Sequence, residues 1–316
     1  MKCKKVISKL LILVFTFSLM ISASSVNKVH ADAFKVVTLG ADLSNEQKEQ
    51  MLKYFGVTTK EANVIEVDKE EEDKYLAGIA TRNQIGTKSI SCAYVEPTDK
   101  GGLNISTNNI YWVTESMIRN ALITAGIENA NVKVGSPFNV SGTAALTGIL
   151  KGFETSKGGK KIDEKKKKVA NEEMVVTGNL GEKIGQDEAA NLINEVKKEV
   201  IKEKPKTEKE IKNIVKDTTD KYEYKLNDED MQKITALMDK INGLDLDFKQ
   251  IKNQLDQVSN KLKDVVTSEE AKGFFRKLWE GIKNFFDSIL NSDKEEKTTS
   301  YNITEIQHMN FNNLRI

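Results

Sequence analysis

The pattern of hydrophobic and polar positions divides the chain into three regions. A basic start at 1–9 leads into an apolar run at 10–21 and then a polar stretch. Residues 32–155 combine alternating segments with segments of helical spacing, and from 156 onward apolar positions recur three and four residues apart among charged residues. Because alternation predicts strands and three-to-four spacing predicts helices, we expect a leader, a mixed region and a helical region.

The leader has the parts of a secretory signal peptide. Four lysines and no acid precede the apolar run, and Val29-His30-Ala31 offers small or β-branched residues before a cut at Asp32. The run is 12 residues long, whereas a membrane-spanning helix needs roughly 20, so we predict cleavage rather than a retained anchor. Cys3 lies ahead of the run, which argues against lipid attachment at a mature N-terminal cysteine. We therefore predict a secreted, extracellular protein, with retention at the cell envelope left open.

The mixed region at 32–155 is predicted to be an α/β domain within an α+β fold, with the element order β-α-β-α-β-β-α-β-α. Capping side chains and glycines mark the helix boundaries: Ser44 with Gln47, Asp68, Thr114 and Ser141 at starts, and Gly56 and Gly126 at ends. The loop Thr98–Gly102 between two alternating segments predicts a β-hairpin. The predicted elements are 34–39, 46–55, 63–67, 69–79, 89–95, 103–107, 115–125, 132–134 and 142–153.

The remainder of the chain is predicted to be helical, with spacing typical of coiled coils. A charged linker and helix at 156–186 contain a run of solvated lysines, and a helical region follows at 187–291. The break at Asn242–Asp247 indicates a turn between two antiparallel helices. The predicted helices of this region are 187–202, 208–221, 231–241, 248–265 and 268–290, and the tail at 292–316 is predicted to be disordered.

Charge and cysteine content narrow the choice of partner. Five of the 48 basic residues and no acid lie in 1–31, so the mature chain would hold 43 basic and 47 acidic residues, a net charge of −4. This balance suits solubility and excludes a nucleic-acid partner. Cys92 is the single cysteine of the mature chain, so no intramolecular disulfide can form, and we expect it to be a buried strand residue.

Five sequence motifs carry a resemblance to a known family. They are LGADLS at 39–44, FGV at 55–57, IGTKSIS at 85–91, IYWVTESM at 110–117 and PFNVSGTAALTGI at 137–149. With them the chain resembles, over roughly 34–290, the YpuA-like family, domain of unknown function 1002. The resemblance implies an extracytoplasmic protein of low-GC Gram-positive bacteria that is linked to the envelope. It implies no catalytic residue, cofactor or ligand.

The scarcity of histidine limits the catalytic chemistry. His30 lies in the leader and His308 in the tail, so the body has no imidazole to activate a serine or cysteine nucleophile. Zinc sites use mainly histidine and cysteine ligands, and Cys92 is the single such residue of the body. No phosphate loop of the form G-x-x-x-x-G-K-[ST] occurs in the sequence. We therefore expect no metal and no cofactor. A carboxylate pair remains open, with Asp42 and Glu96 as candidates by position.

Candidate ligand contacts lie at two turns. Ser141 and Thr143, at a predicted helix start, could present a hydroxyl and free amides to an anion, and Asp42 lies at a strand-to-helix turn. The alternative interpretation is that Ser141 caps its helix and that Asp42 belongs to a tight connection.

The helix predicted at 268–290 has a broad aromatic face opposite basic residues. Its candidates for membrane or partner contact are Phe275, Trp279, Ile282 and Phe286. Such a face packs on other helices of the chain, mediates homo-oligomer formation, or lies in a membrane interface. All three possibilities stay open at this point.

These observations favour an envelope-associated protein that binds or senses a component outside the membrane and is not an enzyme. One alternative is a carboxylate-dependent hydrolase acting on cell-wall polymer, and another is a scaffold tethered to the membrane surface. A cell-envelope component or the membrane surface would be the partner.

Overall fold

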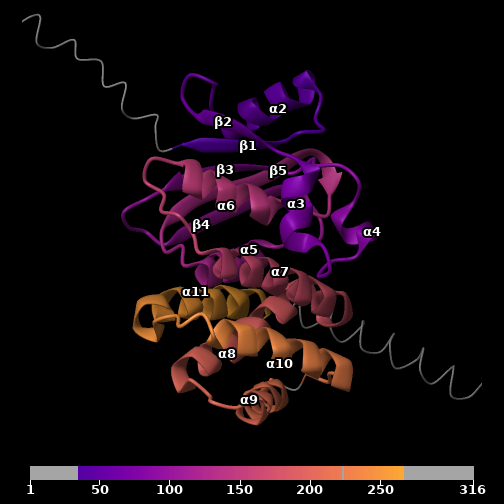
Figure 1. Cartoon of the computed structure of the whole chain (residues 1–316), viewed down its shortest axis with the longest axis vertical. Coiled ribbons are helices and arrows are strands. Elements are labelled where there is room, and N and C mark those ends of the chain that lie inside the picture. The colour runs from indigo at the N-terminus through magenta and orange to yellow at the C-terminus, as the bar shows by residue number, and fades with distance from the viewer. Residues whose placement is uncertain (1–34, 223, 267–316) are drawn as a thin grey trace, which may run out of the picture. The chain divides into compact units, whose positions relative to one another are not determined.

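The computed structural model of the chain describes residues 35–222 and 224–266, with side chains up to 260 (Figure 1). The predicted signal peptide, the helix predicted at 268–290 with its four aromatic and apolar candidates, and the predicted tail lie outside these residues. Within them, a five-stranded mixed sheet with flanking helices precedes a helical region, which confirms the α+β fold class. The sequence pattern and the structure therefore agree on architecture.

The elements follow the predicted order, with one additional short helix. The strands are β1 (Val36–Gly40), β2 (Asn63–Val67), β3 (Cys92–Pro97), β4 (Leu103–Ile110) and β5 (Ala130–Val140). The helices beside the strands are α2 (Asn45–Phe55), α3 (Lys69–Leu76), α4 (Arg82–Ile85), α5 (Glu115–Ala125) and α6 (Ala145–Thr155). The helical region consists of α7 (Glu164–Ile184), α8 (Gln186–Glu203), α9 (Glu208–Lys221), α10 (Asp228–Asn242) and α11 (Phe248–Val266).

The strand order is β2-β1-β3-β5-β4, and it corrects the predicted hairpin. β5 lies between β3 and β4, antiparallel to β3 and parallel to β4, while β1 is parallel to β2 and antiparallel to β3. The turn Thr98–Gly102 therefore joins two strands that do not pair. The prediction was wrong because a turn signal reports only a local reversal, and the α5 crossover that inserts β5 is a long-range feature.

The two faces of the sheet are covered by different helices. Val37 and Cys92 pack with Met51 and Phe55 of α2 in one apolar cluster. Thr38 points to the opposite face, because successive strand residues alternate, and there its hydroxyl oxygen would lie 2.7 Å from a Cβ added at Gly148 of α6. The burial of Cys92 confirms the expectation that it is a core thiol, and burial raises the pKa of Cys92 to about 12.

Most predicted helix boundaries are confirmed at the level of single hydrogen bonds. Ser44 and Gln47 form the predicted capping box of α2, and Gly56 ends that helix in the left-handed region with φ of 72°. The boundary at Ser141 is wrong, since α6 begins at Ala145 with Ala144 as its N-cap residue and without a side-chain cap. A hydroxyl in a helical pattern does not cap a helix when a tertiary partner binds it.

Helix α7 packs against both α5 of the α/β part and α8 and α10 of the helical region (Figure 1). Helix α7 includes the second half of the predicted lysine run. Lys167 in this run is only 6% exposed, so the run is not uniformly solvated. The Nζ atom of Lys167 lies 2.7 Å from Glu154 and 2.8 Å from Glu164. The described residues up to Ser259 form one compact unit.

Candidate functional site

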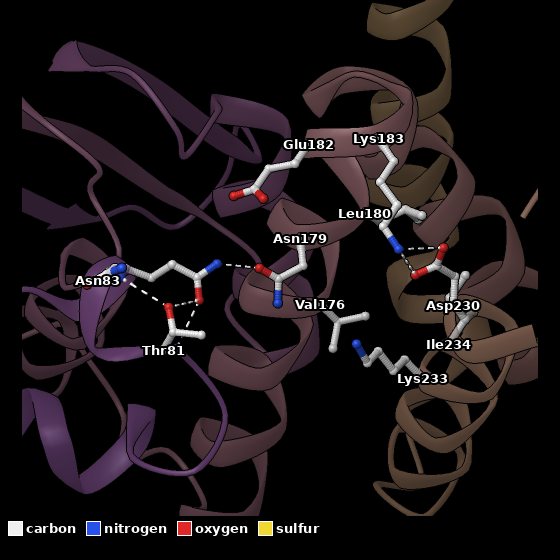
Figure 2. A pocket seen from close by; sticks show the side chains of 11 residues that line it. Thr81, Asn83, Val176, Asn179, Leu180, Glu182, Lys183, Asp230, Lys233 and Ile234 are labelled. Carbon is white, nitrogen blue, oxygen red and sulfur yellow. Dashed lines mark hydrogen bonds and ion pairs between the residues drawn. The ribbon is translucent and has the colours of Figure 1, made fainter. Parts of the chain in front are cut away.

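Three elements that are far apart in the sequence line a half-open pocket of about 440 Å³ (Figure 2). One wall comes from the turn at α4, the second from the last turns of α7, and the third from the first half of α10. Small-molecule sites commonly have volumes of roughly 300–1,000 Å³, so this pocket has the size of a ligand site. Its lining residues are Thr81, Asn83, Gln84, Val176, Asn179, Leu180, Glu182, Lys183, Asp230, Lys233 and Ile234.

Gln84 holds the α4 wall against α7. Its side-chain oxygen accepts hydrogen bonds from the backbone N–H of Thr81 at 2.9 Å and from the Thr81 hydroxyl at 3.0 Å. Its side-chain nitrogen donates to the Oδ1 atom of Asn179 on α7. Because both ends of one amide are used, Gln84 fixes the orientation of Asn179, whose side chain lines the pocket.

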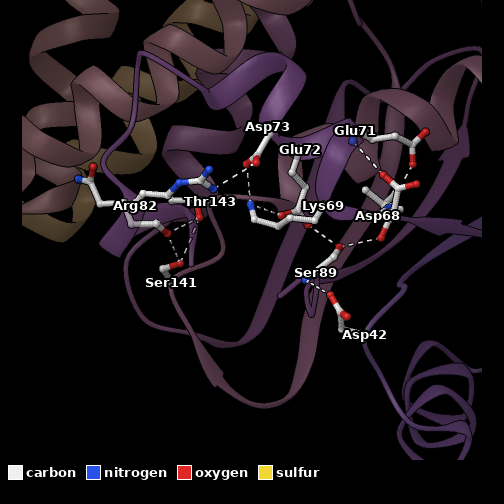
Figure 3. A network of polar contacts seen from close by, with 12 residues as sticks. Asp42, Asp68, Lys69, Glu71, Glu72, Asp73, Arg82, Ser89, Ser141 and Thr143 are labelled. Carbon is white, nitrogen blue, oxygen red and sulfur yellow. Dashed lines mark hydrogen bonds and ion pairs between the residues drawn. The ribbon is translucent and has the colours of Figure 1, made fainter. Parts of the chain in front are cut away.

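Ser141 and Thr143 support the same wall from the connection between β5 and α6 (Figure 3). Their hydroxyls donate to the backbone carbonyl oxygen of Gln84 at 3.2 Å and 2.8 Å. Neither residue is among those that line the pocket. Two of the three residues that the sequence indicated as ligand contacts therefore hold the turn whose neighbouring side chains form the wall.

An ion pair closes the pocket on the side of α10. The Nζ atom of Lys183 lies 2.7 Å and 2.9 Å from the two carboxylate oxygens of Asp230. Asp230 is 7% exposed, so its carboxylate is largely shielded from water and its charge is balanced by Lys183. Val176, Leu180 and Ile234 supply apolar surface beside this pair (Figure 2).

Glu182 is coupled to a buried indole. The Nε1–H group of Trp112 donates to Oε1 of Glu182 at 3.0 Å, and Trp112 is 8% exposed. Gly178 on α7 makes room for the ring, because a Cβ there would lie 2.1 Å from the ring atom Cη2. A change in the contacts of the Glu182 carboxylate should therefore alter the environment of the Trp112 indole.

Opposite charges lie on the two sides of Asn179 in the pocket, Glu182 on one and Lys233 on the other (Figure 2). The hydrogen bond from Lys233 to Glu229, 2.5 Å long, raises the pKa of Lys233, so this group is cationic at neutral pH. An anionic group, an amide and a cationic group that lie side by side next to apolar surface can bind a ligand that carries both signs of charge.

A second polar network joins the ends of β1 and β2 to the segment before β3 (Figure 3). The Ser89 hydroxyl lies 2.7 Å from the carbonyl oxygen of Val67 and is hydrogen-bonded to the Glu72 carboxyl group. Asp42 accepts a hydrogen bond from the backbone N–H of Ser89 at 2.7 Å. Ser89 and Glu72 are completely buried, so these contacts act as an internal clamp, and Asp42 is part of it.

Burial shifts the pKa of the Glu72 carboxyl group. Burial raises the pKa of Glu72, and the hydrogen bond from Ser89 and the charge of Lys69, 3.3 Å away, oppose that shift. The Ser89 hydroxyl has one proton and two acceptors within reach, the Val67 carbonyl oxygen and the Glu72 carboxyl group.

The two candidate acids for hydrolysis lie at opposite ends of β1. Asp42 follows the last residue of β1, whereas Glu96 comes one residue after Val95, which pairs with Val36 at the first residue of β1. An acid pair for glycoside hydrolysis needs its carboxyl groups within roughly 5–10 Å across a cleft. The strand register therefore does not bring these two acids together.

Sequence reasoning missed the pocket because its parts are remote along the chain. Thr81 and Asp230 line one cavity, although 149 positions separate them. The one local signal was the short capping pattern Thr81-x-x-Gln84, which marks α4. Among the described residues, no group of three or more His, Cys, Asp or Glu side chains is placed to hold a metal ion. Nor does any helix in 35–222 and 224–266 combine the length and apolar character of a membrane span.

Comparison with known proteins gives one family and one relative. The family model described as "Protein of unknown function (DUF1002)" matches residues 39–258. The uncharacterized protein YpuA of Bacillus subtilis (strain 168) is 39% identical over 259 residues, which cover 81% of this chain and 87% of YpuA. No solved structure matches the chain.

Proposed function

We propose a function from the premise that this chain belongs to the DUF1002 family of proteins of unknown function: it is an exported, envelope-associated binding protein that is not an enzyme. Its ligand is a small zwitterion of the amino-acid or short-peptide class, held in the pocket between α4, α7 and α10. The observation that carries the proposal is the placement of Glu182 and Lys233 on either side of Asn179.

The pocket offers one type of contact for each part of such a ligand. The Glu182 carboxylate suits an ammonium group, and the Lys233 ammonium suits a carboxylate. Asn179 can bind a peptide amide, and its orientation is fixed by Gln84. Val176 and Ile234 give a small side chain apolar surface. The charges in the pocket come in both signs, which favours a zwitterion over a polyanion.

The chemistry of the described body supports binding rather than bond breaking. Neither histidine of the chain lies between residues 31 and 307, and the buried thiol of Cys92 and hydroxyl of Ser89 lie in the interior, out of reach of a substrate. Transfer of a proton at neutral pH most often uses an imidazole. The hydrolase alternative is not supported by its candidate pair, because the strand register keeps Asp42 and Glu96 apart.

Fluorescence of Trp112 offers a direct test, since its indole N–H is bound to Glu182 in the pocket wall. Trp279 is the second tryptophan of the chain, so a Trp279→Phe background isolates the signal. The probes are alanine, L-alanyl-L-alanine and D-alanyl-D-alanine, titrated into the mature chain. We expect a saturable change with at least one of the peptides.

Two lysines on α10 give a matched pair of variants. Lys233 lines the pocket and is 51% exposed, whereas Lys240 pairs with Glu172 and is 50% exposed. Lys233→Gln should weaken peptide binding at least tenfold, and Lys240→Gln should bind like the parent chain. If none of the three probes changes the emission, or if both variants bind equally, the proposal is wrong.

A further inference from the structure

The open half of the sheet carries a second polar site that is separate from the pocket at α4. Two rows of side chains run across β3, β5 and β4 in register, on the face that α2 partly covers. The first row is Glu96, Asn131 and Asn104, and the second is Tyr94, Lys133 and Ser106. Together with Val132, these six residues line a pocket of about 260 Å³.

Helix α2 ends the open area at the next row. There Gly135 of β5 lies opposite Cys92 and Asn108, and a Cβ at Gly135 would lie 3.0 Å from Met51 and 3.1 Å from Tyr54. The side chains of α2 therefore press on the sheet at this row. The two preceding rows form a shallow, polar shelf with α2 along one side.

The first row is a directed chain of hydrogen bonds across three strands. The Nδ2 atom of Asn104 donates to Oδ1 of Asn131 at 3.5 Å, and Nδ2 of Asn131 donates to Oε2 of Glu96 at 3.0 Å. The 3.0 Å bond to Glu96 orients the Asn131 amide, whereas the contact from Asn104 lies at the long end of the hydrogen-bond range. The row presents donors and acceptors side by side, which suits a polyhydroxylated ligand.

The residue types on the shelf cost strand stability. Asparagine is depleted in strands, where β-branched and aromatic residues are favoured, yet outward positions of β4 are Asn104, Ser106 and Asn108, and Asn131 lies beside them on β5. A solvated strand face is ordinarily built from residues such as threonine. Departures from local preference are expected at functional or strained sites, and the shelf is such a departure.

The charges and the aromatic ring narrow the class of ligand. Lys133 lies over the ring of Tyr94 at 5.5 Å, and Glu96 provides the opposite charge in the adjacent row. The shelf thus has no net charge, which disfavours a polyanion. Tyr94 is 6% exposed and the other side chains are polar, which disfavours an apolar partner or a membrane surface. A neutral ligand with many hydroxyl or amide groups fits this chemistry.

We propose that the shelf formed by β3, β5 and β4 binds a neutral oligosaccharide. The amides of Asn104 and Asn131 bind its hydroxyl or acetamido groups, and Glu96 accepts from a further hydroxyl. Lys133 donates to a ring or hydroxyl oxygen from the second row. This site does not depend on the zwitterion pocket, because the two share no lining residue.

The test is titration of the mature chain with chitotetraose and with cellotetraose, followed by the side-chain amide signals of asparagine in nuclear magnetic resonance spectra. Saturable shifts of the Asn104 and Asn131 amides are expected with at least one of the two sugars. The double variant Asn104→Val/Asn131→Val should weaken binding at least tenfold. Valine is favoured in strands, so this variant is expected to keep the fold, which its thermal unfolding midpoint checks.

Asn83→Ala is the control variant, since Asn83 lines the other pocket and is absent from the shelf. It should bind the sugar like the parent chain. The proposal is overturned if neither tetrasaccharide gives a saturable shift, or if the folded double variant binds with unchanged affinity. A loss seen in Asn83→Ala and not in the double variant would also overturn it, because the sugar would then occupy the zwitterion pocket.

Discussion

Lys197 and Glu173 form an ion pair of 2.7 Å whose two side chains are completely buried. The ammonium of Lys197 also donates to the carbonyl oxygen of Asn120 at 2.9 Å and to the hydroxyl of Thr124 at 3.2 Å. Burial lowers the pKa of Lys197, and the Glu173 carboxylate opposes that shift. Helices α5, α7 and α8 are thus joined by a charged contact in the interior.

The variant Lys197→Met should reduce the free energy of unfolding by about 3–5 kcal/mol, because it leaves Glu173 buried without its cation. The double variant Lys197→Met/Glu173→Leu should recover most of that loss, since it removes both charges. Urea denaturation followed by circular dichroism measures the difference. The control is Lys198→Met, whose partner Asp256 is partly exposed; its effect should stay within about 1 kcal/mol. A double variant as unstable as the single one would contradict the argument.

The buried carboxyl group of Glu72 should make stability depend on pH. Because burial raises its pKa, the folded chain binds a proton that the unfolded chain has already lost, so stability falls as pH rises from the unfolded pKa through the folded pKa. Glu72→Gln keeps a donor to Ser89 and removes the titration. The stability of this variant relative to the parent should therefore increase with pH. Urea midpoints measured at intervals from pH 4 to 8 test this, and parallel profiles for the two proteins would exclude a protonated Glu72.

The sequence predicted the local features of this fold well and its long-range pairing poorly. The capping box of Ser44 with Gln47 and the left-handed Gly56 were predictable because each depends on residues three or four positions apart. The insertion of β5 between β3 and β4 depends on the parallel register of Ile105 with Val132. Nothing local at either strand specifies that neighbour, so the loop between β3 and β4 suggested a hairpin instead.

The candidate site was less accessible from the sequence than the fold. The sequence indicated Ser141 and Thr143 as polar residues at a turn, and the structure places both hydroxyls on the carbonyl oxygen of Gln84. Contact of these residues with a ligand stays a prediction. The sequence gives no local signal for Glu182 and Lys233, because a glutamate and a lysine are ordinary residues in charged helices. Their place in one pocket depends on the approach of α4 to α7 and α10, which only the tertiary structure reveals.

Substitution of Gly178 should disturb the packing of the Trp112 ring against α7. A Cβ at this position would overlap the indole ring, so Gly178→Ala should destabilise the fold by about 1–3 kcal/mol through overpacking. The displaced indole should also shift its emission to longer wavelength in the Trp279→Phe background. Gly243→Ala is the matched control, because the nearest atom to a Cβ there is the end of the Lys165 side chain at 3.3 Å. Equal stability and emission for Gly178→Ala and its parent would show that α7 can move away from the ring.

Export of the chain is a separate prediction, and it decides in which compartment any ligand is met. In a Gram-positive host, the mature protein should begin at Asp32 and be found in the culture fluid or the cell-wall fraction. The residue before the cut should be small, so Ala31→Leu should leave the leader uncleaved and the chain with the cells. Ala23→Leu makes the same change at a position well before the cut; it is the control and should be processed like the parent. Mass spectrometry of the fractions distinguishes the two forms. Recovery of the parent chain in the cytosol at its full mass of 35.4 kDa would contradict export, and the zwitterion would then have to be sought among intracellular solutes.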